Sequence, residues 1–240
     1  MEIILSDTMK LLYKGKAKSM YEKGKDEVIM EFRDDLTAGD GAKKATKEGK
    51  GALNAEISAR LLKLMEDSGV KTHFIEFQRP DKFLVKRVEI IPLEVICRNV
   101  ATGSLVRRYP FEEGQELSPP IIEFGYKSDE YHDPMLNDDI AIALGVSTKE
   151  ELDQIKGITL KVNEILKGFL NPRGIILVDF KLEFGRDSKG NLLLADEISP
   201  DTCRFWDAET KEIMDKDRFR KDLGDVLEYY REVRRRVLGG

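Results

Sequence analysis

LVDFKLEFGRDSKGNLLLADEISPDTCRFWD, residues 177–207, is the stretch that decides the fold. Two apolar runs that carry charged residues flank a polar turn containing Gly190, a pattern that predicts two antiparallel strands. Side chains two positions apart share one face of a strand, so Asp179, Lys181 and Glu183 should project together. Charges placed among apolar residues in this way must be solvated, paired or used for binding.

The charged residues of this predicted hairpin allow two interpretations. Glu183 and Asp196, on neighbouring strands, can hold a hard cation while Lys181 holds an anion beside it, which is the outline of a magnesium–nucleotide site. A half-exposed amphipathic hairpin with cross-strand ion pairs explains the same pattern. The stretch alone leaves both interpretations open.

Size and composition restrict the classes of function. The chain has 240 residues, 35% of them charged and 41% hydrophobic, which fits a globular protein with one large domain or two small ones that share a cleft. The net charge of −5 argues against general nucleic-acid binding, and no apolar stretch approaches the length of a membrane span. Cys97 and Cys203 form no metal-ligand spacing and suit a reducing cytoplasm. We therefore expect a cytoplasmic protein with no nucleic-acid or membrane partner.

Hydrophobic periodicity and turn residues predict a mixed α+β chain. Ser147 followed by Glu150 indicates a capping box at the start of the clearest helix. Residues 89–92 are the candidate hinge between two lobes. The remaining expectations are short strands within 11–33, a long loop over 34–51, a helix over 52–68, strands over 72–77, 83–88 and 93–101, a short helix over 104–109, mainly loop over 110–137, and helices over 147–171 and 217–238.

The segment Gly15-Lys16-Ala17-Lys18-Ser19 lies between two predicted strands. Glycine lets backbone amides approach a phosphate closely, and lysines supply positive charge. The spacing is not that of a Walker loop, but it is similar to the glycine hairpin that covers nucleotide phosphates in kinases. A surface turn with lysines is the alternative. Lys86, inside an apolar strand, suits either a phosphate-pairing lysine or the solvated face of that strand.

Several other residues suit the binding of an anion. Residues 98–108 run from a strand through Gly103 into a helix, where Ser104 and Arg98 can bind a phosphate or form an ordinary helix cap. Arg204 follows the charged hairpin and suits an anion clamp or a packing corner. Asp133 precedes a proline in a loop, which favours a turn followed by a helix cap.

Taken together and in order, these segments resemble the phosphoribosylaminoimidazole-succinocarboxamide synthase (SAICAR synthetase) family, of the short, single-function microbial type. The resemblance runs from about residue 10 to the C-terminus, and no departure at a motif position weakens it. The segments that carry it are GKAKSMYE (15–22), DDLTAGDGAK (34–43), EVICRNVATGSLVRR (94–108), HDPMLNDD (132–139), LVDFKLEFG (177–185), DEISPDTCRFWD (196–207) and KDRFRKDLG (216–224).

The resemblance implies a fold and a reaction. The fold is α+β, with two lobes and ATP in the cleft between them, related in layout to kinases and ATP-grasp enzymes. Residues 1–90 should form a nucleotide-binding lobe, mainly antiparallel sheet with one helix, and residues 91–240 an α+β lobe with the magnesium and substrate-phosphate residues. The reaction joins L-aspartate to the carboxylate of CAIR, 5-amino-1-(5-phosphoribosyl)imidazole-4-carboxylate, through an acyl phosphate. ATP is the co-substrate, Mg²⁺ the cofactor, and a homodimer the expected assembly.

The resemblance also implies a role for individual residues. Glu183 and Asp196 should bind magnesium, and Lys181 should stabilise the transferring phosphoryl group. Asp40 and Asp133 should border the CAIR ring and the aspartate site and act in catalysis. The residues implied for ATP are Gly15, Lys16, Ala17, Lys18, Lys86, Val88 and Ile90, and those for the phosphate of CAIR are Arg98, Ser104 and Arg204.

Two other functions fit the residues themselves. A small-molecule kinase with the same lobe plan would share Lys86, Glu183 and Asp196 but would need no aspartate site. A non-catalytic nucleotide-sensing module would bind ATP without turnover and would not depend on Lys181.

Overall fold

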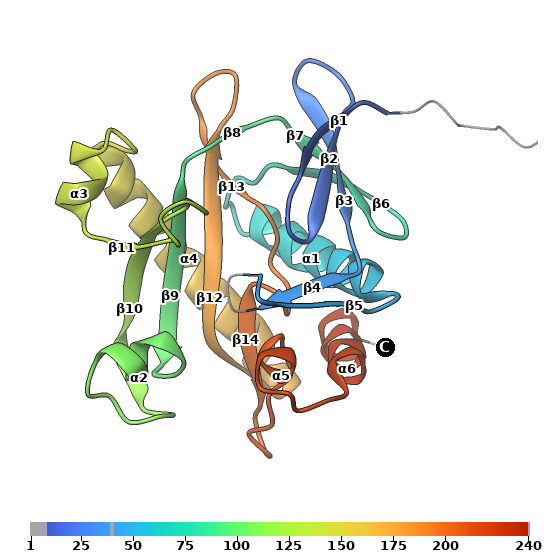
Figure 1. Ribbon diagram of the computed structural model, residues 1–240, viewed down its shortest axis with the longest axis vertical. Helices are drawn as coiled ribbons and strands as arrows, with labels where there is room; N and C mark the ends of the chain where they lie inside the picture. The colour runs from blue at the N-terminus through green and yellow to red at the C-terminus, as the bar shows by residue number, and fades with distance from the viewer. Residues whose placement is uncertain (1–8, 39–40, 240) are drawn as a thin grey trace, which may run out of the picture.

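The computed structural model describes residues 9–38 and 41–239 and contains two main antiparallel sheets (Figure 1). The first sheet has five strands in the order β1-β2-β3-β7-β6, and the helix α1 (Lys50–Asp67) packs against it. The apolar stripe predicted for this helix supplies that contact, since Ile57, Leu61 and Met65 are fully buried. The strands are β1 (Leu11–Lys14), β2 (Lys18–Glu22), β3 (Glu27–Phe32), β6 (Phe74–Gln78) and β7 (Lys82–Lys86).

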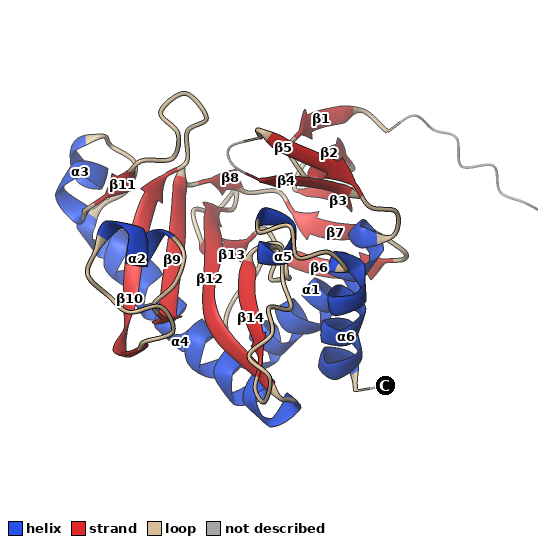
Figure 2. Cartoon of the chain, turned by 60° about the horizontal axis from the view of Figure 1, so that its bottom comes forward, coloured by secondary structure: helices blue, strands red, loops and turns tan. Residues whose placement is uncertain are grey.

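The second sheet is built around one long strand, β12 (Ile175–Arg186). β12 pairs with β14 through its first half, with β9 through its middle and with β13 and β8 through its second half. The helix α4 (Lys149–Leu170) packs against β9 and β12, and Figure 2 shows it crossing beneath these strands. Of the charged residues of β12, Asp179 and Glu183 are buried, whereas Lys181 and Arg186 are half-buried. The other strands are β8 (Glu89–Ile90), β9 (Leu93–Val100), β10 (Glu116–Tyr126), β11 (Met135–Leu136), β13 (Leu192–Ala195) and β14 (Cys203–Asp207).

The C-terminal helices return to the N-terminal part of the molecule. The helix α6 (Val226–Leu238) packs against α1 (Figure 1). A small second core joins it to the short helix α5 (Asp217–Arg220) and to a two-stranded ribbon of β4 (Asp35–Ala38) and β5 (Lys43–Thr46). The remaining elements are α2 (Ser104–Arg108), α3 (Asp138–Ala143) and a single 3₁₀ turn, η1 (Asn171–Arg173).

The α+β fold with two lobes is confirmed, as are the short strands before residue 33 and the antiparallel hairpin whose turn contains Gly190. The second strand predicted within 177–207 is divided into β13 and β14, which both pair with β12. The helix cap predicted after Asp133 is formed by Asn137. A relation in layout to kinases and ATP-grasp enzymes stays a prediction. Among the residues that the structure describes, no helix is both long enough and apolar enough to cross a membrane.

Four sequence predictions were wrong. The expected loop over 34–51 contains β4, β5 and the first two residues of α1. The expected loop over 110–137 contains β10, whose Pro119 and Pro120 lie where pairing with β9 is interrupted, so they remove no ladder bond there. The expected final helix is divided between α5 and α6 by Gly224 and Asp225, both at positive φ. The long helix is capped by Thr148, whose hydroxyl accepts from the N–H of Glu151, rather than by Ser147.

Candidate functional site

Two carboxylates lie side by side where the lobes meet. Glu183 of β12 pairs in register with Ala195 of β13, so Asp196, the next residue, lies beside it, and both side chains are largely buried. Burial alone would raise the pKa of the Asp196 carboxyl, but Lys18, Lys181 and Lys127 outweigh it and lower that pKa to about 2. Burial and the charge of Asp196 raise the pKa of Glu183, yet the same lysines lower it overall. Both acids are therefore ionised at neutral pH.

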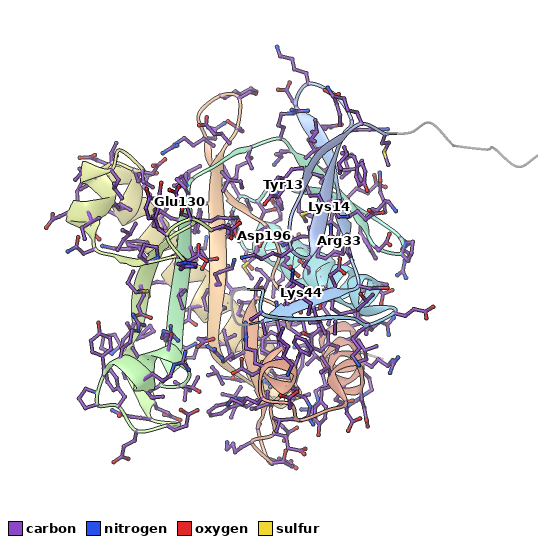
Figure 3. The ribbon with its side chains drawn as sticks, in the orientation of Figure 1. Tyr13, Lys14, Arg33, Lys44, Glu130 and Asp196 are labelled. Atoms are coloured by element: carbon purple, nitrogen blue, oxygen red, sulfur yellow. The ribbon has the colours of Figure 1, made fainter. Side chains whose placement is uncertain are left out.

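Three lysines from separate elements surround these acids. Lys18 of the β1–β2 hairpin contacts Asp196 and donates to Glu197 at 2.8 Å. Lys181 of β12 donates to Glu183 at 3.0 Å and to Glu94 at 2.9 Å, and Lys127 contacts Glu183. The pKa values of Lys18 and Lys181 are raised, because the carboxylates outweigh the lowering effect of burial. Figure 3 shows Asp196 between β12 and the hairpin that carries Tyr13 and Lys14.

The lysine hairpin, residues 11–22 with Lys16 and Lys18 at its turn, is held in shape by hydrogen bonds within its own lobe. The N–H of Gly15 donates to the carbonyl of Lys18 at 2.8 Å and closes the turn between β1 and β2. Arg33 donates to the carbonyls of Gly15 and Lys16 at 2.8 and 3.0 Å, and its own N–H donates to the carbonyl of Ala17 at 2.8 Å. Lys16, at the exposed tip, donates to Asp129 of the opposite lobe at 2.8 Å. The hairpin thus reaches over the acid pair in a fixed shape.

The segment that contains Val88 and Ile90, which the resemblance implies for ATP, crosses between the two sheets. Ile90 of β8 pairs with Gly185 of β12, two residues beyond Glu183. Val88 packs so closely on Gly185 that a Cβ built there would lie 2.7 Å from its Cγ2. Lys86 donates from Nζ to the carbonyl of Thr72 at 3.0 Å rather than to a carboxylate.

A second charged cluster lies at the first half of β12. Arg98 of β9, which is 2% exposed, donates to Asp179 at 3.1 Å and to the hydroxyl of Ser104 at 2.9 Å. Arg204 of β14 donates to Asp179 at 2.7 Å and to Asp217 at 2.8 Å. Asp179 and Glu183 are four residues apart, so β12 separates the two clusters by about 13 Å. The structure therefore brings together all three residues predicted for the substrate phosphate.

Asp133, one of the predicted catalytic residues, takes no part in the contacts described above. Asp40 lies outside the described residues. The carboxylate of Asp133 accepts from the N–H of Ser128 at 2.8 Å and so shapes the turn next to Lys127. Its catalytic role stays a prediction.

Sequence reasoning missed several residues of this site. Glu94, Lys127 and Glu197 bind the lysines and acids described above, and Arg33 braces the hairpin. The signal for Glu94 was available, because it shares a strand face with Arg98 of the same motif. Lys127 follows β10, which was expected to be loop, and Arg33 lies at the end of a predicted strand to which no role was assigned.

The acid pair fits a cation that arrives with its phosphates. Among residues 9–38 and 41–239, no group of three or more Asp, Glu, His or Cys side chains forms a closed metal cage. Magnesium typically uses one or two carboxylates and completes its coordination with phosphate oxygens and water. Glu183 and Asp196 supply two such carboxylates beside a lysine hairpin, which suits a metal–nucleotide complex better than a resident ion.

Comparison with known proteins yields a consistent set of relatives. Residues 11–237 match the family model described as SAICAR synthetase. The chain is 61% identical over 239 residues to the phosphoribosylaminoimidazole-succinocarboxamide synthase of Methanocaldococcus jannaschii, with 99% of each chain covered. A solved SAICAR synthetase in complex with ADP superposes with a TM-score of 0.94 at 54% identity, covering 96% of this chain and 98% of that one. The enzyme from Ehrlichia chaffeensis has a TM-score of 0.93 at 45% identity, with 95% and 98% covered.

Proposed function

The chain belongs to the SAICAR synthetase family, and on this premise we propose that it is an ATP-dependent carbon–nitrogen ligase. It joins L-aspartate to the carboxylate of CAIR and gives SAICAR, ADP and phosphate in de novo purine biosynthesis. The observation that supports this best is the arrangement along β12, which holds an acid–lysine cluster at one end and an arginine–serine cluster at the other. A substrate with a carboxylate at one end and a phosphate at the other can span both clusters.

The chemistry requires an activated carboxylate, because oxide is too poor a leaving group for direct amide formation. A carboxylate oxygen of CAIR attacks the γ-phosphorus of ATP, the bond to ADP breaks, and an acyl phosphate results. The amine of aspartate then attacks the acyl carbon, the bond to phosphate breaks, and the amine loses a proton. The protein must hold several anions close together during these steps, which calls for fixed positive charge and exclusion of water.

The acid–lysine cluster is proposed to hold the nucleotide. Residues Gly15–Lys18 cover the phosphates, Lys86 lies near them, and Val88–Ile90 contact the adenine. Glu183 and Asp196 would hold the magnesium ion, which would supply positive charge to the phosphates when bound. Lys18, Lys127 and Lys181 neutralise these two acids and would supply positive charge to phosphate oxygens in the nucleotide complex. Lys181 then faces the transferring phosphoryl group.

The arginine–serine cluster is proposed to hold the phosphate of CAIR. Arg98 and Arg204 both donate to Asp179, which keeps the two guanidinium groups in place without substrate, and the hydroxyl of Ser104 accepts from Arg98. Arginine suits this role because its planar fork binds phosphate in a bidentate manner. Asp40 and Asp133 are proposed to border the imidazole ring and the aspartate.

The wider assignments follow the same premise. We divide the chain at residue 90, where β8 passes from the first sheet to β12, into lobes of residues 1–90 and 91–240. A homodimer and a cytoplasmic location are proposed from the family resemblance, and both cysteines are free and buried, which fits a reducing compartment. Analytical ultracentrifugation tests the dimer.

Incubation with CAIR, ATP, magnesium and L-aspartate tests the function. Mass spectrometry should show SAICAR, together with one ADP and one phosphate for each SAICAR. Release of phosphate without amide product and regardless of aspartate would identify a small-molecule kinase. Binding of ATP without turnover would identify a nucleotide-sensing module.

A further inference from the structure

Asp196, one of the two proposed metal ligands, has an unusual backbone. Its φ of 62° lies in the left-handed region, which residues with a Cβ rarely adopt. The side chain leaves β13 immediately after Ala195, and the left-handed turn directs it toward Lys18 and Glu183. Such a conformation persists only where surrounding contacts hold it.

His73 contacts the backbone of Asp196. Its Nε2 lies 3.0 Å from the Asp196 carbonyl oxygen, and a carbonyl only accepts, so Nε2 carries the proton and donates it. His73 is 3% exposed and cannot exchange this bond for one to water without opening the core. The ring is therefore a fixed donor aimed at one carbonyl.

The segment that carries His73 is itself held against β13. The N–H of His73 donates to the carbonyl of Leu194 at 2.9 Å, and the N–H of Leu194 donates to the carbonyl of Lys71 at 3.0 Å. These two bonds form a short parallel bridge between Thr72 and Leu194. Residues 71–73 and 194–196 thus run side by side although 123 positions separate His73 from Asp196.

The same segment also holds the proposed nucleotide lysine. The N–H of Lys86 donates to the carbonyl of His73 at 2.7 Å, and its Nζ donates to the carbonyl of Thr72 at 3.0 Å. Residues 71–73 therefore lie between Lys86, in the first sheet, and Asp196, at the end of β13.

We propose that His73 is a positioning residue for the metal site. Its imidazole fixes the peptide of Asp196 in the left-handed conformation, so that the carboxylate faces Glu183 and can bind the cation of a metal–nucleotide complex. The inference rests on the proposed function only in taking Glu183 and Asp196 as the metal ligands. Removal of a contact that orients a metal ligand without binding the metal itself typically lowers metal affinity or activity by about 10- to 100-fold.

Binding of Mn²⁺ in the presence of ADP, followed by electron paramagnetic resonance of the free ion, tests the proposal. His73→Leu should weaken Mn²⁺ binding by about 10-fold or more. His73→Gln should restore most of the affinity, because its amide N–H can reach the same carbonyl. Glu66→Gln is the matched control, since Glu66 accepts from the N–H of Thr72 at 2.6 Å and supports the segment without touching Asp196. That variant should bind Mn²⁺ like the unaltered protein.

The outcomes separate positioning from simple packing. Unchanged Mn²⁺ affinity in folded His73→Leu overturns the proposal, and so does an equal loss in Glu66→Gln. If circular dichroism shows that His73→Leu does not fold, His73→Asn replaces it, because the shorter amide does not reach the carbonyl. Equal affinity of the Asn and Gln variants then overturns the proposal. The measurement uses neither CAIR nor aspartate, so failure to form SAICAR would refute the proposed function and leave this inference standing.

Discussion

Asp179 is a buried carboxylate between two arginines, and this arrangement makes the arginine–serine cluster testable one residue at a time. Removal of Arg204 leaves Asp179 paired with Arg98 and leaves Asp217 paired with Arg220 at 2.5 Å. Neither acid becomes a buried charge without a partner, which is the usual cause of severe destabilisation. The Arg204→Ala variant should therefore fold.

Arg204→Ala should raise the KM for CAIR by about 10- to 100-fold, the value of charge-assisted hydrogen bonds to one phosphate. The KM for ATP should change little, because Arg204 donates to Asp179 and Asp217, away from Glu183 and Asp196. Steady-state kinetics with each substrate varied in turn give both constants. Arg107→Ala, an exposed arginine on α2, serves as control. An equal rise in both KM values would contradict the assignment of Arg204 to the phosphate of CAIR.

Asp215 gives a prediction about pH. It is fully buried, and burial with the charge of Asp217 raises the pKa of its carboxyl to about 7, although backbone N–H groups act against this. Between its ordinary value of 3.8 and about 7, the folded protein keeps a proton that the unfolded chain has lost. The contribution of Asp215 to stability should therefore fall as pH rises through this window, by at most about 1.4 kcal/mol per pH unit, and level off above it.

Urea unfolding at several pH values between 4 and 8 checks this for the wild-type protein and Asp215→Asn. Asparagine does not titrate, so the free energy of unfolding of the wild type relative to the variant should decrease as pH rises. His73, whose pKa burial lowers to about 4, acts with the opposite sign but equally in both proteins. A difference that stays constant from pH 4 to 7 would show that Asp215 is already ionised at pH 4.

At the scale of elements, β8 and β12 connect the two lobes, and their closest contact is at Gly185, which has no side chain. A Cβ on Gly185 would lie 2.7 Å from Cγ2 of Val88 and 3.0 Å from the carbonyl oxygen of Glu89, closer than such atoms approach. Gly185→Ala must therefore displace the segment proposed to contact adenine.

Gly185→Ala should raise the KM for ATP and lower the free energy of unfolding by about 1–3 kcal/mol, as overpacking commonly does. The KM for CAIR should be less affected, since Arg98 and Arg204 lie at the other half of β12. Gly157→Ala is the control, because this exposed glycine of α4 has open space at its Cβ and alanine favours helix. If both variants keep wild-type KM values for ATP, β8 does not position the nucleotide.

Sequence patterns located β12 and β13, because charges at alternate positions within an apolar run have few structural explanations. They did not locate β10, since Pro119 and Pro120 are typical of loops and only the gap in its pairing with β9 accommodates them. They also missed β4 and β5, whose small polar ribbon is stabilised by packing of Leu36 and Ala38 on α5 and α6. In both cases, contacts with segments distant in the sequence stabilise the strands, and a local sequence pattern carries no information about such contacts.

The site shows the same division between local and distant information. The acids and arginines lie in motifs whose order along the chain resembles a family, so their identity was predictable. The partners of these residues were less predictable. Lys127 contacts Glu183 from a loop 56 positions away, and Lys18 contacts Asp196 from 178 positions away. Which lysine meets which acid is a property of the tertiary fold.

At the scale of the whole molecule, a buried ion pair joins the first helix to the C-terminal segments. Lys50, at the start of α1 and 1% exposed, donates to Asp201 at 2.7 Å and to the carbonyl of Asp35 at 2.8 Å. Asp201, in the loop before β14, also accepts from the hydroxyl of Tyr230 of α6 at 2.7 Å. Burial would raise the pKa of Asp201, but Lys50 and Lys216 outweigh it and lower that pKa overall.

Lys50→Met should therefore lower the free energy of unfolding by about 3–5 kcal/mol, because it leaves the Asp201 charge buried without its main partner. Lys50→Met combined with Asp201→Asn should lose less than the single variant, since the second change removes the stranded charge. Lys63→Met is the matched control: it breaks the exposed Lys63–Asp67 pair of the same helix, and a change of at most about 0.5 kcal/mol is expected. Urea unfolding of the four proteins measures these differences. A double variant less stable than Lys50→Met would mean that Asp201 holds the loop and α6 together by its hydrogen bond to Tyr230, whether or not Lys50 is present.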